Sequence, residues 1–103
     1  MLRPAGVLAL AALSAACAGG LATDAECTAM LDRYLDMTIA GAPDLTNLSP
    51  AAAERTRQER KVAQKAAEGY VRSHAQCASE VSRREWRCAM KTFTLEAWQA
   101  CID

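Results

Sequence analysis

The stretch TDAECTAMLDRYLDMTIAGAP, residues 23–43, decides the fold because it contains a whole helix together with the signals for both of its ends. Thr23 and Glu26 have the spacing of a capping box, in which the two side chains satisfy free amides at the start of a helix. Gly41 is a typical helix-terminating residue, and Pro43 prevents the helix from continuing. The stretch therefore predicts one helix with defined ends.

The predicted helix is amphipathic, and its apolar side carries a cysteine. With about 100° between successive residues, Asp32, Arg33 and Asp36 fall on the polar side. The opposite arc collects Cys27, Met30, Leu31, Tyr34, Leu35, Met37 and Thr38. This pattern predicts that the helix buries the face that has Cys27 at its centre.

A second, longer helix is predicted after a loop at residues 42–48. Ser49 is a suitable N-cap, and Pro50 at the first helical position loses no hydrogen bond, so the helix is expected to run from Pro50 to about Ser79. Its apolar arc collects Val62, Ala63, Ala66, Ala67, Tyr70, His74, Cys77 and Val81, and its opposite side carries Arg57, Lys61, Lys65 and Arg72. We expect the apolar arc to pack against the first helix.

Two short helices complete the predicted fold. Ser82 and Glu85 form a second capping box, and Thr94 is the N-cap of a last helix over residues 95–102. The inward-facing residues are Trp86, Ala89, Met90 and Phe93 in one helix and Leu95, Trp98 and Cys101 in the other. The sequence has no strand pattern. The expected class is therefore all-α, with an antiparallel helical hairpin and two short C-terminal helices in one domain over residues 23–103.

The four cysteines in the predicted domain indicate two disulfides. An even number of cysteines in a short exported chain is typical of a disulfide framework, and four cysteines allow three pairings. An antiparallel hairpin brings Cys27 beside Cys77, which leaves Cys88 for Cys101. The crossed pairing, Cys27 with Cys101 and Cys77 with Cys88, stays open. Cross-links matter here because aromatic residues are only 5% of the 103 residues, so the core is small.

The net charge of zero argues against a nucleic-acid-binding protein. The charges are nevertheless segregated along the chain. Residues 24–44 carry five acidic side chains and one basic side chain, whereas residues 54–91 carry ten basic and five acidic side chains. This segregation predicts that an acidic helix and a basic helix face each other within one domain.

The N-terminus has the three parts of a secretory signal peptide over residues 1–16. Arg3 supplies the positive charge, the apolar run that follows is too short to span a bilayer, and small residues complete the pattern. The next residues, Leu13-Ser14-Ala15-Ala16-Cys17, resemble the lipobox of bacterial lipoproteins. That resemblance implies a diacylglycerol on Cys17, which becomes the N-terminus of the mature protein, followed by a tether over residues 17–22.

The resemblance also implies a location in the bacterial cell envelope, anchored to a membrane and facing the periplasm. Ala18, in place of an aspartate, permits sorting to the outer membrane. In the lipobox the large apolar residue usually stands three residues before the cysteine, whereas Leu13 stands four before Cys17. Cleavage without lipidation, which gives a secreted soluble protein, is the alternative.

The sequence contains no catalytic pattern. It has one histidine, no Cys-x-x-Cys pair and no Gly-rich phosphate loop. The segment from Cys77 to Cys101, with a tryptophan shortly before the middle cysteine, resembles small exported bacterial proteins that have no assigned activity. We therefore expect a structural or partner-binding role without a cofactor. The alternative is a metal-binding or thiol-redox protein that uses His74 with Met30 and Met37, or a labile cysteine pair.

The candidate partner-binding residues are basic and lie near the start of the second helix: Arg55, Arg57, Arg60 and Lys61. In the expected hairpin the first helix ends opposite about residue 64, which leaves residues 50–61 protruding past it. Four basic side chains on such an arm suit an anionic protein or lipid surface. A merely solvated helix end is the alternative.

Overall fold

The computed structural model describes residues 19–102, and its regular structure in that range is helical apart from one isolated β-bridge. The helices are α2 (Asp24–Ala40), the 3-10 helix η1 (Pro43–Asn47), α3 (Pro50–Ala66), α4 (Glu68–Glu80), α5 (Arg83–Met90) and α6 (Leu95–Ile102). The predicted all-α class is confirmed. None of the helices in this range combines the length and the apolar character that crossing a membrane requires. The predicted signal peptide and Cys17 lie outside the described residues.

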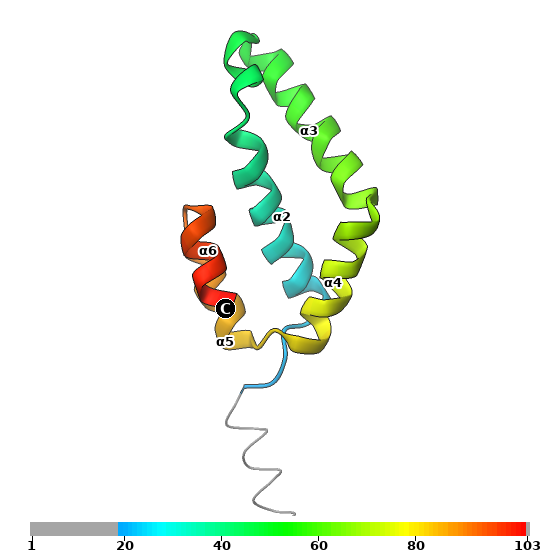
Figure 1. Ribbon diagram of the computed structural model, residues 1–103, viewed down its shortest axis with the longest axis vertical. Coiled ribbons are helices and arrows are strands. Elements are labelled where there is room, and N and C mark those ends of the chain that lie inside the picture. The colour runs from blue at the N-terminus through cyan, green and yellow to red at the C-terminus, as the bar shows by residue number, and fades with distance from the viewer. Residues whose placement is uncertain (1–18, 103) are drawn as a thin grey trace, which may run out of the picture.

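Helix α2 lies between two partners (Figure 1). On one side α4 and α3 run back along it, and on the other side α5 and α6 form a short helical pair. The chain reaches α2 past the corner between α4 and α5, where an antiparallel bridge joins Leu21 to Ser82. The arrangement is the predicted hairpin with two short C-terminal helices.

The helix starts follow the predicted caps. The Thr23 hydroxyl accepts the amide of Glu26 at 3.1 Å, and the Glu26 carboxylate accepts the amide of Thr23 at 2.8 Å. Ser82 and Glu85 make the same reciprocal pair at 3.1 and 2.9 Å. Thr94 accepts an amide of the first turn of α6 at 3.1 Å. These starts are specified by local sequence because each cap satisfies amides that the helix itself leaves free.

Both expected disulfides are present. Cys27–Cys77 joins α2 to α4, with Cα atoms 5.9 Å apart, and Cys88–Cys101 joins α5 to α6, with Cα atoms 5.6 Å apart. The structure thereby excludes the crossed pairing.

The main core lies where α2 meets α4, α5 and α6. Cys27 and Met30 are its most deeply buried large side chains, at 0% and 1% exposure. Trp98 enters from α6 and donates its indole N–H to the backbone carbonyl of Met30 at 3.2 Å. A smaller apolar cluster of Leu35, Ile39 and Leu45 joins the far half of α2 to η1. Apolar packing is therefore concentrated at the end of the molecule that holds both disulfides.

The prediction of one long second helix is wrong, because the helix is interrupted at Ala67. The backbone of Ala67 is extended, with φ −72° and ψ 146°, and it separates α3 from α4. Gly69 lies in the first turn of α4 and lowers the helix propensity next to the break. Helix α4 is fixed to α2 by a disulfide, and α3 leans back from the bend toward the far end of α2 (Figure 1).

Helix α3 also turns a different face toward α2 from the one predicted. Val62 is 69% exposed, and the alanines that share its predicted apolar arc are exposed as well. Two ion pairs join the helices instead: Lys61–Asp36 at 2.9 Å and Lys65–Asp32 at 3.0 Å. The apolar arc of α3 consists mainly of alanines, which gain little from burial, so the carboxylates of α2 decide which face is chosen. The predicted pairing of an acidic with a basic helix is confirmed.

Phe93 does not face inward as predicted but is 86% exposed. Helix α5 ends at Met90, so Phe93 falls in the corner before α6 rather than on the inner face of α5. The Arg33 guanidinium lies 5.4 Å from the centre of the Phe93 ring, and its Nε donates to the carbonyl of Thr92 at 2.9 Å. A residue from the polar side of α2 thus holds the α5–α6 corner in place.

Candidate functional site

An open groove runs along α2 between α4 and α6, with a volume of about 560 Å³. Side chains of α2 form its floor. The Ala67 bend and α4 form one wall, and α6 forms the other. The large apolar and aromatic residues of the lining are Met30, Leu31, Tyr34, Leu35, Tyr70, Trp98 and Ile102. Pockets of this size that are lined by apolar and aromatic side chains are typical of ligand sites in proteins.

Aromatic side chains stand on both sides of the groove. The rings of Tyr34 and Trp98 are tilted against each other, with centroids 4.8 Å apart. Across the groove the Tyr70 hydroxyl donates to the Asp32 carboxylate at 3.3 Å. Burial raises the pKa of Tyr70, and the neighbouring Asp32 charge raises it further, so the phenol stays neutral at physiological pH. The aromatic lining therefore adds no charge to the groove.

The groove rim is polar but carries little charge. Three glutamines and a serine supply neutral hydrogen-bonding groups: Gln64, Gln76, Gln99 and Ser73. Glu80 is the one carboxylate among the lining residues, and Lys and Arg are absent from that set. The one cysteine in the lining, Cys77, is held in a disulfide. This arrangement suits the binding of an uncharged apolar group and offers no activated nucleophile.

The four predicted partner-binding residues lie together on α3, but three of them already bind carboxylates of this chain. Arg57 pairs with Glu54 at 2.8 Å, Lys61 pairs with Asp36 at 2.9 Å, and Arg60 forms a bidentate pair with Asp44. The Arg60 guanidinium lowers the pKa of Asp44 by direct hydrogen bonding. Arg55 is exposed and has no ion pair within residues 19–102.

The predicted overhang of residues 50–61 is too long. A small hollow of about 320 Å³ lies between α3 and the end of α2. It is lined by Glu54, Arg57, Gln58 and Lys61 of α3 and by Asp36, Ile39 and Ala40 of α2. Only the first turn of α3 extends beyond this contact, and there Ala53 is buried at 7% exposure. The expectation assumed one straight second helix in register with Cys27–Cys77. The bend at Ala67 brings α3 back onto α2 instead.

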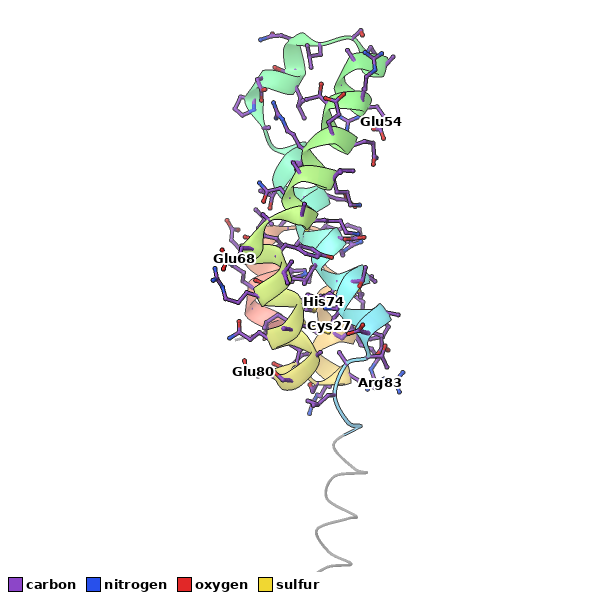
Figure 2. The ribbon with its side chains drawn as sticks, turned by 90° about the vertical axis from the view of Figure 1, so that its right-hand side faces the viewer. Cys27, Glu54, Glu68, His74, Glu80 and Arg83 are labelled. Carbon is purple, nitrogen blue, oxygen red and sulfur yellow. A yellow bond between two sulfur atoms is a disulfide. The ribbon has the colours of Figure 1, made fainter. Side chains whose placement is uncertain are left out.

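His74 lies on the face of α4 that meets α2, close to Cys27 (Figure 2). Its Nε2 is 2.9 Å from the Thr28 hydroxyl, and its Nδ1 is 3.9 Å from the Asp24 carboxylate. Met30, predicted as a possible metal ligand with it, is buried in the core, and Met37 is partly buried. Within residues 19–102, no three His, Cys, Asp or Glu side chains are grouped closely enough to hold a metal ion.

The outer face of α5 is a charged surface that was not singled out from the sequence. Arg84, Arg87 and Lys91 are exposed, and the structure gives them no ion pair within the described chain. Their spacing of three and four residues was the available signal, since it places them on one side of a helix. The buried residues Ala89 and Trp98 show that the opposite side of this helical pair faces the core.

The chain matches no protein-family model, no curated protein sequence and no solved structure.

Proposed function

We propose that this protein is an exported protein of the bacterial envelope, anchored by a lipid on Cys17, that works by binding a partner and not by catalysis. Cysteine usage supports the anchor, because four of the five cysteines pair with one another and leave Cys17 for a different purpose. Two disulfides in so short a chain also favour an oxidising compartment such as the periplasm.

The groove is the observation that carries the binding role. Its floor is apolar and aromatic, and its rim has amides that can hydrogen-bond a peptide backbone. The single carboxylate in the lining, together with the lack of Lys and Arg there, disfavours an anionic ligand. We therefore assign to the groove an uncharged, apolar segment of a partner protein.

The basic residues on α3 have a different place in this proposal. An acidic partner at this surface would have to displace the carboxylates that Arg57, Arg60 and Lys61 already bind. We assign to Lys61 and Arg60 the task of holding α3 against α2 and η1, whereas the Arg57 pair with Glu54 lies within α3. The contacts with an anionic surface then fall to basic residues without internal partners.

The groove can be tested with a neutral apolar dye such as Nile red, titrated into the purified oxidised protein. Ser73→Arg places a guanidinium at the groove rim. A bound apolar ligand would cover this charge and exclude water from it, which costs free energy. We expect dye affinity to fall about tenfold or more. Val71→Arg is the matched control, because Val71 lies on the same helix but is 59% exposed and is not part of the lining.

Both variants should keep the thermal unfolding midpoint of the parent protein, since both positions are exposed. Equal dye binding by the two variants would show that the dye does not use the groove, and the binding role would lose its support.

A further inference from the structure

We infer that the outer face of α5 rests on an anionic phospholipid bilayer, beside the point where the lipid tether joins the domain. The inference builds on the proposed lipid anchor at Cys17 and adds the orientation of the domain on the membrane. The surface consists of Arg84, Arg87 and Lys91, with exposed apolar side chains at both of its ends.

The charge of this surface is not neutralised by the rest of the described chain. Most of the basic side chains on α3 and α4 lie in ion pairs, and even the exposed Arg72 has Glu68 at 4.0 Å. Arg84, Arg87 and Lys91 are exposed and have no such partner within residues 19–102. They cover about 10 Å of helix, at 1.5 Å per residue. An anionic leaflet attracts basic side chains that lie within about a Debye length of its surface.

The path of the chain places the start of this surface at the tether. The amide of Ala22 donates to the carbonyl of Val81 at 2.8 Å, and the amide of Arg83 donates to the carbonyl of Gly20 at 3.2 Å. Gly19 and Gly20 turn into this pairing with φ values of 74° and 71°, which only glycine adopts easily. Figure 2 shows Arg83 at this end of the molecule, far from Glu54 on α3.

The remaining tether is short. Cys17 precedes Gly19 by two residues, which span at most about 7 Å when extended. A lipid on Cys17 therefore holds the first turn of α5 close to the head groups. The local concentration of anionic lipid around Arg84 is then set by the anchor, and a weak electrostatic contact is enough to fix the orientation.

Exposed apolar side chains lie at both ends of the basic surface. Leu21, which pairs with Ser82 just before α5, is 50% exposed, and Phe93, two residues after Lys91, is 86% exposed. Basic residues flanked by exposed leucine and phenylalanine are typical of surfaces that lie in the membrane interface. None of the residues that line the groove belongs to α5, so this orientation leaves the groove open to a partner.

The experiment uses the non-lipidated Cys17→Ser protein with its disulfides intact and measures co-sedimentation with vesicles at low salt. We expect binding to vesicles that contain phosphatidylglycerol and little binding to pure phosphatidylcholine. Each basic residue near an anionic leaflet contributes about fivefold, so the loss of two positive charges in Arg84→Glu/Arg87→Glu should weaken binding at least about 30-fold, and the two added negative charges should weaken it further. Arg72→Glu is the control for an exposed basic residue elsewhere and should leave binding within about twofold.

An equal loss in Arg72→Glu and Arg87→Glu would show that only overall charge matters, and binding that is unchanged in the double variant would overturn the inference directly. The outcome is separate from that of the anchor, which is read from the mass of the mature protein. If the mature protein carries no acyl chain but its vesicle binding still depends on α5, the proposed membrane surface is supported and the proposed lipid anchor is contradicted. If the mature protein is acylated but its vesicle binding does not depend on α5, the lipid anchor is supported and the membrane surface is contradicted.

Discussion

At the scale of single residues, the five cysteines fall into two kinds. Cys27 and Cys77 form one cross-link and Cys88 and Cys101 form the other, and each cross-link joins two different helices. Cys17 is not among the residues that the structure describes, which begin two positions later at Gly19. The two disulfides are complete without it, so we expect a substitution at Cys17 to leave both cross-links in place.

Cys17→Ser should move the protein from the membrane fraction to the soluble fraction of fractionated cells. The reason is that a serine hydroxyl cannot take the thioether-linked lipid, whereas no packing contact of residues 19–102 is altered. The thermal unfolding midpoint of the soluble form should equal that of the detergent-extracted parent protein. Ser14→Ala keeps a small residue before the cysteine and is the matched control, which should stay in the membrane fraction. Unchanged fractionation of Cys17→Ser would contradict the anchor.

Residues whose positions depend on local sequence were predicted well. Thr23, Ser82 and Thr94 cap their helices because the groups that they satisfy lie within one turn. Phe93 was misplaced because its burial depended on how long α5 is. The Thr92 hydroxyl donates to the carbonyl of Ala89 at 2.7 Å and closes the last turn of α5 before Phe93 is reached. The spacing of apolar residues does not indicate where α5 ends.

At the scale of elements, α3 differs from the other helices in what holds it. Ala53 is its one buried residue, and its ion pairs with α2 are made by two lysines, Lys61 and Lys65. These pairs lie near the surface, with side chains 21–61% exposed. Ion pairs in contact with water are weak and are screened by salt, with a screening length of about 10 Å at 0.1 M and about 3 Å at 1 M. We therefore expect α3 to open more readily than the rest of the molecule.

Lys61→Gln/Lys65→Gln should release α3 while the core around Cys27 stays folded. Hydrogen exchange resolved by peptide is the measurement: amides of α3 should exchange faster, and those of α2 near Cys27 should not change. Salt at 1 M should have the same effect on the parent protein and little further effect on the variant. Arg72→Gln on α4 removes a basic residue that does not join α2 and is the control. Faster exchange throughout the chain would mean that α3 is part of the cooperative core.

Two ion pairs of α3, one with η1 and one with α2, predict the pH range in which α3 stays attached. The Arg60 hydrogen bond lowers the pKa of Asp44 below its ordinary 3.8, so this pair stabilises the fold above pH 3.8 and is lost as the pH falls through the lowered value. The hydrogen bond to Asp32 raises the pKa of Lys65 above its ordinary 10.5, so that contribution is lost only as the pH rises through the raised value. Exchange of α3 amides should accelerate at both extremes.

Charge segregation predicted that α3 and α2 face each other, whereas apolar periodicity predicted the wrong face of α3. A helical wheel treats Val62 and its neighbouring alanines as a core face, but their burial would gain less than that of leucines would. The break at Ala67 was not predicted either, although Gly69 lowers the helix propensity in the turn that follows it. The groove forms at this bend and so was missed together with it.

At the scale of the whole molecule, the two disulfides contribute unequally to stability. Cys27–Cys77 spans 50 residues and Cys88–Cys101 spans 13. In the chain-entropy model these loops are worth about 4 and about 3 kcal/mol. Cys27 is also fully buried, whereas Cys88 is exposed.

Cys27→Ala/Cys77→Ala should therefore lower the free energy of unfolding more than Cys88→Ala/Cys101→Ala. Chemical denaturation of the two variants and the parent protein measures the difference. Each variant removes a complete pair and leaves no new free thiol in the domain, so each serves as the control for the other. Equal midpoints at equal denaturant slopes would mean that loop length does not govern the stability of this fold.

The longer cross-link has a further consequence for the fate of the chain when a protease cuts it. Cys27 and Cys77 close a covalent ring that contains η1 and the whole of α3, the basic helix that we expect to open most readily. A single cut anywhere in that ring leaves both pieces attached to the disulfide, and the half that carries the N-terminus stays joined to the half that carries α5 and α6. A molecule cut once in this ring thus keeps both pieces and gains only the mass of one water, so the cut is separated into two fragments only after reduction of the disulfide. If the protein is anchored in the envelope as proposed above, release of the half that carries α5 and α6 requires reduction of Cys27–Cys77 or a cut outside this ring.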